Sequence, residues 1–289
     1  MKKLLIGLIV VIIFIVPLWL RPDSSKGTKS DEETACETNM NIDGEELPLE
    51  EYILGVIAAE MPASYHLEAL KAQAIAARTY AFHKLKNGEG QLTATTKHQV
   101  FYTPTERKER WLASYDMYEQ KLTQAVEETA GEIMTYGGEP ISAMFHAASN
   151  GKTESAANYS GHDIPYLQSV SSPETDEKTQ PVQNNTQWST DVLLAAKVVV
   201  NDTGRVDYVL MNGERISGRD IREQLNLRST DFSFYKEGGS VLVKTKGYGH
   251  GVGMSQKGAN IFAEEGKTAD EILLHYYRGV KIETISCKK

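Results

Sequence analysis

The sequence predicts an α+β fold of mixed helices and antiparallel hairpins, preceded by one N-terminal transmembrane helix. Apolar residues recur at helical spacing in several segments, and short apolar runs flank turn pairs such as Asn212-Gly213. Helices and hairpins follow one another without the strand-helix-strand rhythm of a parallel sheet, which favours the α+β class. The 289 residues, 40% of them hydrophobic and 24% charged, suffice for one large or two modest domains.

The N-terminus has the pattern of a membrane segment. Lys2 and Lys3 precede Leu4–Leu20, an uncharged stretch that would make a helix of roughly 25 Å, close to the thickness of a bilayer core. The positive-inside rule then leaves the N-terminus in the cytoplasm and the remaining chain outside it. A cleaved signal peptide is the alternative, but Pro17–Pro22 has no small-residue cleavage pattern. We therefore expect residues 1–21 to form a cytoplasmic stub and an uncleaved anchor.

The rest of the chain divides into a linker and a folded part. Residues 22–41 are polar and lack apolar periodicity, which predicts a flexible linker, and residues 42–289 are the expected extracytoplasmic domain, with a subdomain boundary near residue 187. Cys36 and Cys287 could form a disulfide or remain free thiols. The net charge of -8, with no Lys/Arg-rich stripe, argues against a nucleic-acid partner.

Helical patterns occur throughout the folded part. Pro62 ends the first helix, Ser64 is the expected N-cap of the second, and Asn87-Gly88 is its expected stop. Thr268 and Glu271 form a capping box that opens the last helix. The predicted helices are Leu49–Met61, Leu67–Lys86, Tyr115–Thr129, Thr190–Lys197, Ser217–Leu225, Ser255–Glu265 and a last one that ends at Tyr277.

Strand patterns are shorter. Gly137–Pro140 predicts a turn between Glu132–Tyr136 and Ile141–His146, and the Asn-Gly pair at 212–213 predicts a second hairpin. The other predicted segments are the strands Arg205–Leu210, Arg215-Ile216, Val241–Lys246 and Lys281–Ile285, and the loops Glu89–Trp111 and Ser149–Gln187.

Glu60 is the candidate acid. It follows Ile53, Val56 and Ile57 at helical spacing, on the face that a soluble helix buries. Burial should raise the pKa of its carboxyl group, so that the group keeps its proton near neutral pH and can donate it to a leaving oxygen. The alternative, which periodicity alone favours, is a buried structural glutamate paired with an arginine such as Arg78.

Two polar clusters could bind a ligand. Residues 145–154 place an imidazole, hydroxyls, an amide and a carboxylate at the end of a strand, which suits sugar hydroxyls and amides, although a structural turn fits equally well. Residues 246–256 carry four alternating glycines before a helix, so the backbone could approach a ligand closely. The alternative there is a tight structural turn with His250 packed internally. The spacing matches no nucleotide-binding loop.

Metal and acyl-transfer sites are poorly supported. No pair among the seven histidines has the His-Glu-x-x-His spacing, and a zinc site built from His146 and His250 would be unspecific. Ser149 and Ser255 lack a nucleophile-elbow context.

Three stretches share the motifs of one family. They are Glu51-Tyr52 and Val56–Pro62 followed by Leu70–Ala74 and Ala77–Tyr80, then Ser149–Glu154, and finally Gly249–Gln256 with Gly258-Ala259. All three resemble the stage II sporulation protein D (SpoIID) family, and the resemblance covers about Ile42 to Ile285.

This resemblance implies a peptidoglycan lytic transglycosylase that acts in engulfment during endospore formation. Such an enzyme cleaves MurNAc-GlcNAc bonds of peptide-stripped glycan strands and leaves 1,6-anhydro-MurNAc ends. The C6 hydroxyl of the sugar is the nucleophile, so Glu60 alone suffices as acid and then base, whereas a hydrolytic glycosidase needs two carboxyl groups. The implied residues of the substrate groove are Arg78, Tyr80, His146, Ser149, Asn150, Thr153, Glu154, His250, Ser255 and Gln256.

The resemblance also implies a location and partners. The protein would be a single-pass protein of the mother-cell membrane facing the forespore, with its catalytic domain outside the cytoplasm. Its partners would be glycan strands, the sporulation amidase/endopeptidase (stage II protein P) and a membrane protein (stage II protein M). Some relatives carry a Cys/His metal cluster after the second helix, but Glu89–Trp111 has only His98, so we expect no zinc and no cofactor.

Two other function classes compete with this one. The first is a non-catalytic wall-binding module that recruits or stimulates a peptidoglycan amidase, since related domains are described as amidase enhancers. The second is a metal-dependent wall peptidase.

Overall fold

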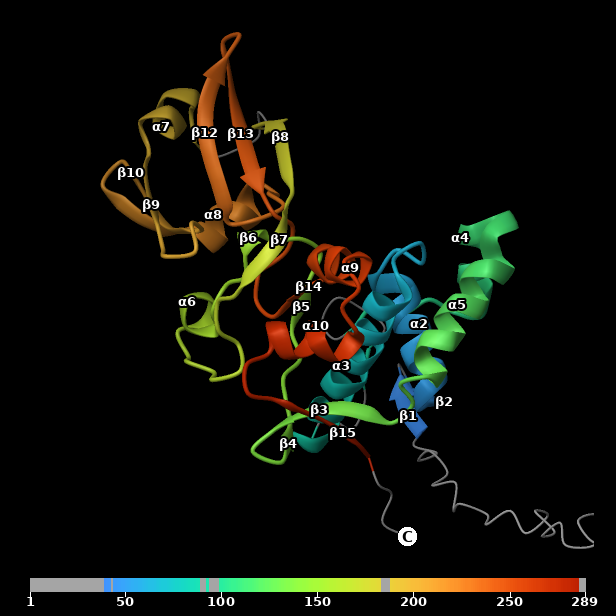
Figure 1. The fold of residues 1–289 in the computed structure, drawn as a ribbon. Coiled ribbons are helices and arrows are strands. Elements are labelled where there is room, and N and C mark those ends of the chain that lie inside the picture. Colours follow the sequence, from blue (N-terminus) through green and yellow to red (C-terminus); the bar gives the residue numbers. More distant parts are fainter. Residues whose placement is uncertain (1–38, 43, 89–91, 94–98, 183–187, 286–289) are drawn as a thin grey trace, which may run out of the picture. The chain divides into compact units, whose positions relative to one another are not determined.

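The computed structural model describes residues 39–42, 44–88, 92–93, 99–182 and 188–285, which belong to one compact unit (Figure 1). Helices and small antiparallel sheets are mixed within it, which confirms the α+β class. The predicted membrane segment, Cys36, Cys287 and most of the linker lie outside these residues. Among the residues described, no helix has the length and apolar character needed to cross a bilayer.

Most helices begin and end close to their predicted bounds. The helices predicted are α2 Leu49–Glu60, α3 Leu67–Lys86, α5 Tyr115–Glu127, α7 Thr190–Ala195, α8 Gly218–Gln224, α9 Gln256–Glu264 and α10 Ala269–Tyr276, and two more, α4 Pro104–Trp111 and α6 Ala156–Ser160, lie in segments predicted as loops. The N-cap predicted for α3 is wrong, because the His66 ring rather than Ser64 accepts a hydrogen bond from Glu68 N, at 3.3 Å. The loop predicted for Glu89–Trp111 is also wrong in part, because Thr103 and Glu106 form a complete capping box that starts α4.

The strands form several small sheets. They are β1 Asn39–Ile42, β2 Glu45–Pro48, β3 Glu132–Tyr136, β4 Glu139–Pro140, β5 Phe145–His146, β6 Asn150–Lys152, β7 Ser171–Thr175, β8 Glu177–Pro181, β9 Lys197–Val200, β10 Val206–Met211, β11 Glu214–Ser217, β12 Asp231–Glu237, β13 Ser240–Lys246, β14 Met254–Ser255 and β15 Lys281–Thr284. Three of the sheets have the orders β15-β3-β4, β12-β13-β8 and β11-β10-β9. The Asn212-Gly213 hairpin is confirmed, and the strand predicted for Lys281–Ile285 is present as β15, which pairs with β3.

Two strand predictions are wrong in part. The hairpin after β3 is present, but its second strand starts earlier than predicted, at β4, and Ile141 N donates to Met134 O at 3.2 Å. At the other end of the predicted strand Ile141–His146, β5 pairs in parallel with β14, far along the chain. The predicted loop Ser149–Gln187 contains β6, α6, β7 and β8. These strands were not apparent in the sequence because β7 turns Ser172 and Glu174 inward, so its buried face is polar and gives no apolar alternation.

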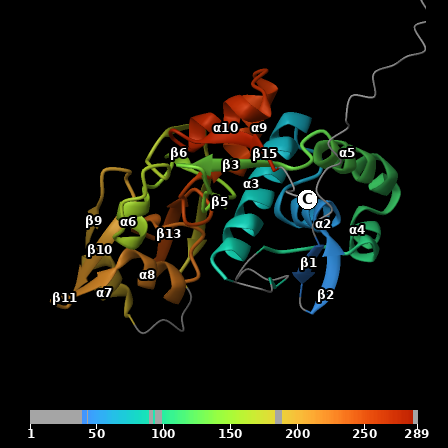
Figure 2. The same ribbon diagram turned by 90° about the horizontal axis from the view of Figure 1, so that it is seen from below.

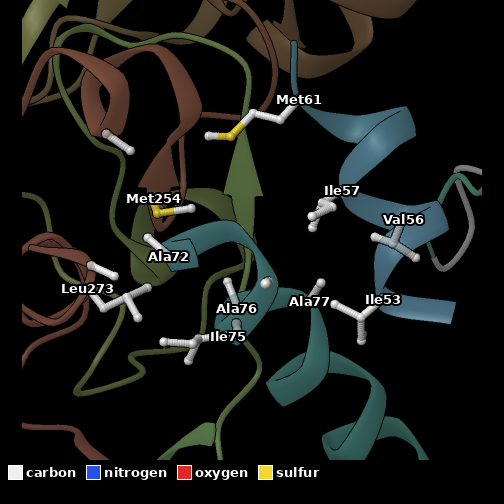
Figure 3. Packing of buried hydrophobic residues seen from close by; sticks show 14 of the residues in the cluster. Ile53, Val56, Ile57, Met61, Ala72, Ile75, Ala76, Ala77, Met254 and Leu273 are labelled. Carbon is white, nitrogen blue, oxygen red and sulfur yellow. The ribbon is translucent and has the colours of Figure 1, made fainter. Parts of the chain in front are cut away.

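The main core surrounds α3. Figures 1 and 2 show this helix with α2 and α5 on one side and α9 and α10 on the other, in agreement with its packing contacts. Its alanines, such as Ala72, Ala76 and Ala77, are fully buried and let the neighbouring helices approach closely (Figure 3). The core therefore holds α2, which ends at Glu60, against α3.

A second hydrophobic cluster lies in residues 193–243, where Val209, Ile221 and Val243 are fully buried. It is built from α7, α8 and the sheets of β9–β13. The subdomain boundary near residue 187 stays a prediction.

Candidate functional site

Glu60 is the last residue of α2 and is partly buried. Its Oε1 accepts a hydrogen bond from Val100 N at 3.1 Å. Burial raises the pKa of the Glu60 carboxyl group, and the Val100 N–H opposes this by stabilising the carboxylate. No charged side chain in the described part of the chain contributes to the shift. The arrangement therefore favours a carboxylic acid that keeps its proton to higher pH than an exposed glutamate.

The structural alternative, a buried pair between Glu60 and Arg78, is wrong. Arg78 is fully buried and makes two hydrogen bonds to the carboxylate of Glu50, Nε to Oε1 at 3.0 Å and Nη2 to Oε2 at 2.5 Å. Its Nη1 donates to Glu132 O at 3.1 Å. The guanidinium thus joins α2, α3 and β3, and it leaves Glu60 without a cationic partner among the described residues.

The donor to Glu60 is positioned by packing against α2. Phe101 lies on the backbone of Gly55, where a Cβ atom would stand only 2.1 Å from the ring. Tyr102 N donates to Gly55 O at 3.0 Å, and the Tyr52 hydroxyl donates to Gln99 Oε1 at 3.0 Å. A segment predicted as a surface loop therefore packs along the helix and carries the Val100 N–H to Glu60.

The two polar clusters predicted as binding loops meet in the fold. Besides the β5 and β14 pairing, Ala148 and Tyr248 exchange backbone hydrogen bonds of 3.0 and 2.7 Å. Glu154 N donates to Gly251 O at 2.7 Å. The stretches 145–154 and 247–256 thus form one layer, although about a hundred residues separate them in the sequence. Met61, next to Glu60, and Met254 belong to the same hydrophobic core (Figure 3).

A buried carboxylate, Glu174, holds Ser149 and Ser255 together. Its Oε1 accepts hydrogen bonds from Ser149 N, at 2.7 Å, and from the Ser255 hydroxyl. Its Oε2 accepts from the Ser172 hydroxyl at 2.6 Å, and that hydroxyl also contacts the Tyr276 hydroxyl at 2.8 Å. Ser149 and Ser255 are fully buried, so both have internal structural partners.

Glu154 has a similar internal role. Its Oε1 accepts from Ser155 N and Asn158 Nδ2, both at 2.9 Å, and its Oε2 accepts from Asn201 Nδ2 at 2.7 Å and the Thr203 hydroxyl at 2.9 Å. Four donors therefore hold a side chain that is only 4% exposed.

The other predicted groove residues also have internal contacts. Asn150 Nδ2 donates to Asp231 Oδ2 at 2.7 Å, the Thr153 hydroxyl accepts from Val170 N at 2.9 Å, and Gln256 Nε2 donates to Gln73 Oε1 at 3.4 Å. Tyr80 is partly buried on α3, with Lys84 Nζ 5.6 Å from its ring centroid. A substrate-binding role for these residues stays a prediction.

His146 and His250 lie side by side, with ring centroids 5.9 Å apart. Burial lowers the pKa of His250 to about 4 and holds the pKa of His146 well below its usual value, so both rings are neutral near pH 7. His250 Nδ1 accepts from Val252 N at 3.1 Å, and His146 Nδ1 contacts Val252 O at 3.2 Å. Within the described ranges no three His, Cys, Asp or Glu side chains are grouped to hold a metal ion, and His98 lies outside them.

Comparison with known proteins identifies the family. Residues 39–136 match the family model described as SpoIID, stage II sporulation protein. The chain is 42% identical over 259 residues to stage II sporulation protein D of Bacillus subtilis (strain 168), which covers 82% of this chain and 75% of the relative. It is 42% identical over 257 residues, with the same coverage, to the stage II sporulation protein D of Bacillus amyloliquefaciens.

The chain belongs to the stage II sporulation protein D family. It is also similar to a protein named amidase enhancer from Bacillus subtilis (strain 168), with 26% identity over 294 residues, covering 79% of this chain and 40% of that protein. The part of the chain that matches the family model contains Glu60 and the segment that contacts it.

Sequence reasoning missed several polar residues in this member of the family. Glu174 was hidden in a segment predicted as a loop. Arg205, Arg219 and Arg222 line one cavity together with the predicted residues Glu154 and His250. The sequence indicated only that Arg219 and Arg222, three residues apart on a predicted helix, lie on the same face of that helix.

Proposed function

We propose that this protein is a peptidoglycan lytic transglycosylase in which Glu60 serves as both acid and base. The observation that carries the proposal is a carboxyl group with a raised pKa, one hydrogen-bond donor and no charged partner among the residues described. A general acid with a pKa nearer the working pH is what cleavage of a glycosidic bond requires.

In the proposed reaction Glu60 first donates a proton and then accepts one. The Glu60 carboxyl group protonates the glycosidic oxygen of GlcNAc as the bond from that oxygen to C1 of MurNAc breaks. The C6 hydroxyl of the same MurNAc then bonds to C1 and passes its proton to the Glu60 carboxylate. Water is not consumed, the product is a 1,6-anhydro-MurNAc end, and Glu60 regains its proton without a second carboxyl group.

Membership of the family supports a role in sporulation and action on the cell wall. We propose further that the protein works in engulfment, anchored by Leu4–Leu20 in the mother-cell membrane with residues 42–289 outside the cytoplasm. The proposed partners are peptide-stripped glycan strands, the amidase/endopeptidase stage II protein P and the membrane protein stage II protein M.

The test of Glu60 is a digestion assay on peptide-stripped glycan strands. We expect the purified wild-type chain to release fragments with 1,6-anhydro ends, which weigh one water less than hydrolysis products. Glu60→Gln keeps an oxygen that can accept the Val100 N–H but has no acidic proton, so the rate should fall at least about 10²- to 10⁴-fold. Glu51→Gln, at an exposed position of α2, is the matched control and should retain full activity.

A correctly folded Glu60→Gln chain that still cleaves glycan would overturn the role of Glu60. The similarity to an amidase enhancer supports a second candidate, a non-catalytic module that binds the wall and stimulates an amidase. That function predicts strand binding and faster amidase turnover in both the wild type and Glu60→Gln, with no anhydro products from either.

A further inference from the structure

A cavity of about 490 Å³ lies in the described part of the chain, beside α6, α8 and β10. Its volume is within the range of sites that bind small ligands. Its charged lining consists of Arg205, Arg219, Arg222, Glu154 and Asp207. Ser217 and Thr230 also line it and carry hydroxyl groups suited to a sugar.

The positive charges in this cavity are offset only in part by described residues, because Glu154, Asp231 and Glu174 favour the charged form of Arg205 without forming an ion pair with it. None of the three arginines forms an ion pair with a described carboxylate, whereas both acidic side chains are already occupied. Glu154 has its four internal donors, and Asp207 Oδ2 lies 3.4 Å from Arg215 Nη2. An anion entering the cavity would therefore meet guanidinium groups whose charge is still available.

Neutral groups hold the arginines in place. Arg222 Nε donates to Leu227 O at 3.2 Å. Arg219 Nη1 donates to Tyr159 O at 3.3 Å, and its guanidinium carbon lies 4.5 Å from the centroid of the Tyr159 ring. Contacts of this kind fix the direction of a guanidinium group and leave its charge unpaired, which prepares it for a planar oxyanion.

Arg205 is the most constrained of the three and is only 2% exposed. It donates to Lys152 O at 3.1 Å and to the Thr203 hydroxyl at 3.3 Å, and its buried Nε has no hydrogen-bond partner among the residues that the structure describes. Gly251, at φ +86°, lies against the guanidinium so closely that a Cβ atom would stand 2.6 Å from Nη2. Burying a charged group this way is costly unless a counter-charge is supplied.

We propose that this cavity binds the free lactyl carboxylate of a muramyl residue through Arg205, Arg219 and Arg222. The anion site follows from the cavity itself, and its assignment to a muramyl sugar rests on the proposed function. Removal of a stem peptide converts the neutral lactyl amide of MurNAc into a carboxylate. A cavity with three unpaired guanidinium groups would therefore distinguish stripped strands from strands that still carry peptides.

The test measures binding of N-acetylmuramic acid to the full chain by calorimetry or NMR titration. We expect binding of the acid, at least tenfold weaker binding of the same sugar with its carboxylate converted to the primary amide, and weaker binding of inorganic phosphate. Arg222→Gln should reduce affinity for the acid at least tenfold, and Arg222→Lys should restore part of it. Arg278→Gln changes an exposed arginine outside the cavity lining and should have no effect.

Arg219→Gln is a second variant in case Arg222→Gln does not fold, because Arg219 is exposed and its loss should be tolerated. Equal binding of the acid and the amide would overturn the proposal. So would phosphate binding as tight as that of the acid, or binding that neither arginine variant weakens.

Cleavage assays separate this inference from the proposed function. Glu60→Gln should abolish cleavage and leave binding of N-acetylmuramic acid unchanged. Arg222→Gln should raise KM for stripped strands more than it lowers kcat. If the wild type cleaves stripped strands and Arg222→Gln has the same KM, the cavity proposal fails while the enzyme assignment stands. If the wild type binds the acid and cleaves nothing, the enzyme assignment fails.

Discussion

The carboxyl groups of Glu60 and Glu174 are both shielded from water, but they differ in the number of hydrogen-bond donors that surround them. Glu174 is 3% exposed and accepts hydrogen bonds from a backbone N–H and two serine hydroxyls. Within the part of the chain that the structure describes, Glu60 has one donor, the Val100 N–H. A carboxylate surrounded by donors is stabilised as part of the fold, whereas a desolvated carboxyl group with few donors has a raised pKa and is available for proton transfer.

The same contrast separates the two sequence regions that carry the family motifs. The α2 motif ends at Glu60, whose carboxyl group accepts only one hydrogen bond from the described residues. The 145–154 and 247–256 motifs contain many polar groups, but most of these bond to internal partners such as Glu174, which holds the two stretches together. Polar residues in a motif can therefore serve chemistry or assembly, and the number of internal partners helps to distinguish the two roles.

The largest effect on stability should come from removing Glu174. Glu174→Ala leaves the buried Ser149 N–H and the Ser172 and Ser255 hydroxyls without their acceptor. An unsatisfied buried donor costs about 1–3 kcal/mol, so we expect a loss of about 3–5 kcal/mol, since the hydroxyls can turn to other acceptors. Urea unfolding of the purified chain measures this loss.

Glu177→Ala, on an exposed position of β8, is the control for Glu174→Ala and should leave the urea midpoint nearly unchanged. Equal midpoints for the two variants would mean that Glu174 does not join the two motifs, and the contrast with Glu60 would lose its basis.

A smaller effect is expected where the backbone of α2 meets the Phe101 ring. Gly55→Ala places a Cβ atom 2.1 Å from that ring, so the ring and the Val100 N–H beyond it must move. Overpacking of this kind costs about 1–3 kcal/mol. Because the hydrogen bond from Val100 N to Glu60 would weaken, we also expect several-fold slower glycan cleavage.

Glu51→Ala tests whether any change in α2 has the same result, because this residue is exposed on the same helix. It should alter neither the unfolding free energy beyond a few tenths of a kcal/mol nor the cleavage rate. If Gly55→Ala behaves like Glu51→Ala, the segment from Gln99 to Tyr102 does not position Val100.

The helices could be predicted because their signals are local. The apolar spacing of Leu49–Glu60, the alanines of Leu67–Lys86 and the capping box at Thr268 all act within a few residues. The burial of Glu60 followed from the same helical spacing. Its partner did not, because periodicity indicates which face is buried but not which residue packs there.

The errors arose where distant residues meet. The structural alternative paired Glu60 with Arg78, but the partner of Arg78 in the fold is Glu50, near the other end of α2. The parallel pairing of β5 with β14 joins residues about 110 positions apart, which no local pattern can indicate. The strand β7 was missed for another reason, because its inward face is polar and gives no apolar alternation. The arginines of the cavity come from two segments whose contact depends on the second hydrophobic cluster.

The smallest predicted effect is a pH dependence of stability. It differs in sign between Glu60, whose pKa is raised, and Glu106, whose pKa is lowered. Burial raises the folded-state pKa of Glu60 above 4.5, so its favourable contribution is fully present below pH 4.5 and is lost as pH rises through the folded-state pKa. Glu106 is the reverse case, because the Thr103 N–H holds its pKa below 4.5, so its contribution is present above pH 4.5 and is lost as pH falls.

Both pH dependences can be measured by urea unfolding of the wild type, Glu60→Gln and Glu106→Gln. The pH series should run from about 3.5 to about 8, so that it includes the usual range of glutamate pKa values. From pH 4.5 upward the wild type should lose stability relative to Glu60→Gln, by about 1.4 kcal/mol for each pH unit that separates the folded and unfolded pKa values. Relative to Glu106→Gln it should instead gain stability as the pH rises toward 4.5. A wild type that gains on Glu60→Gln with rising pH would mean that Glu60 is stabilised as a carboxylate, and its role as the acid would then be untenable.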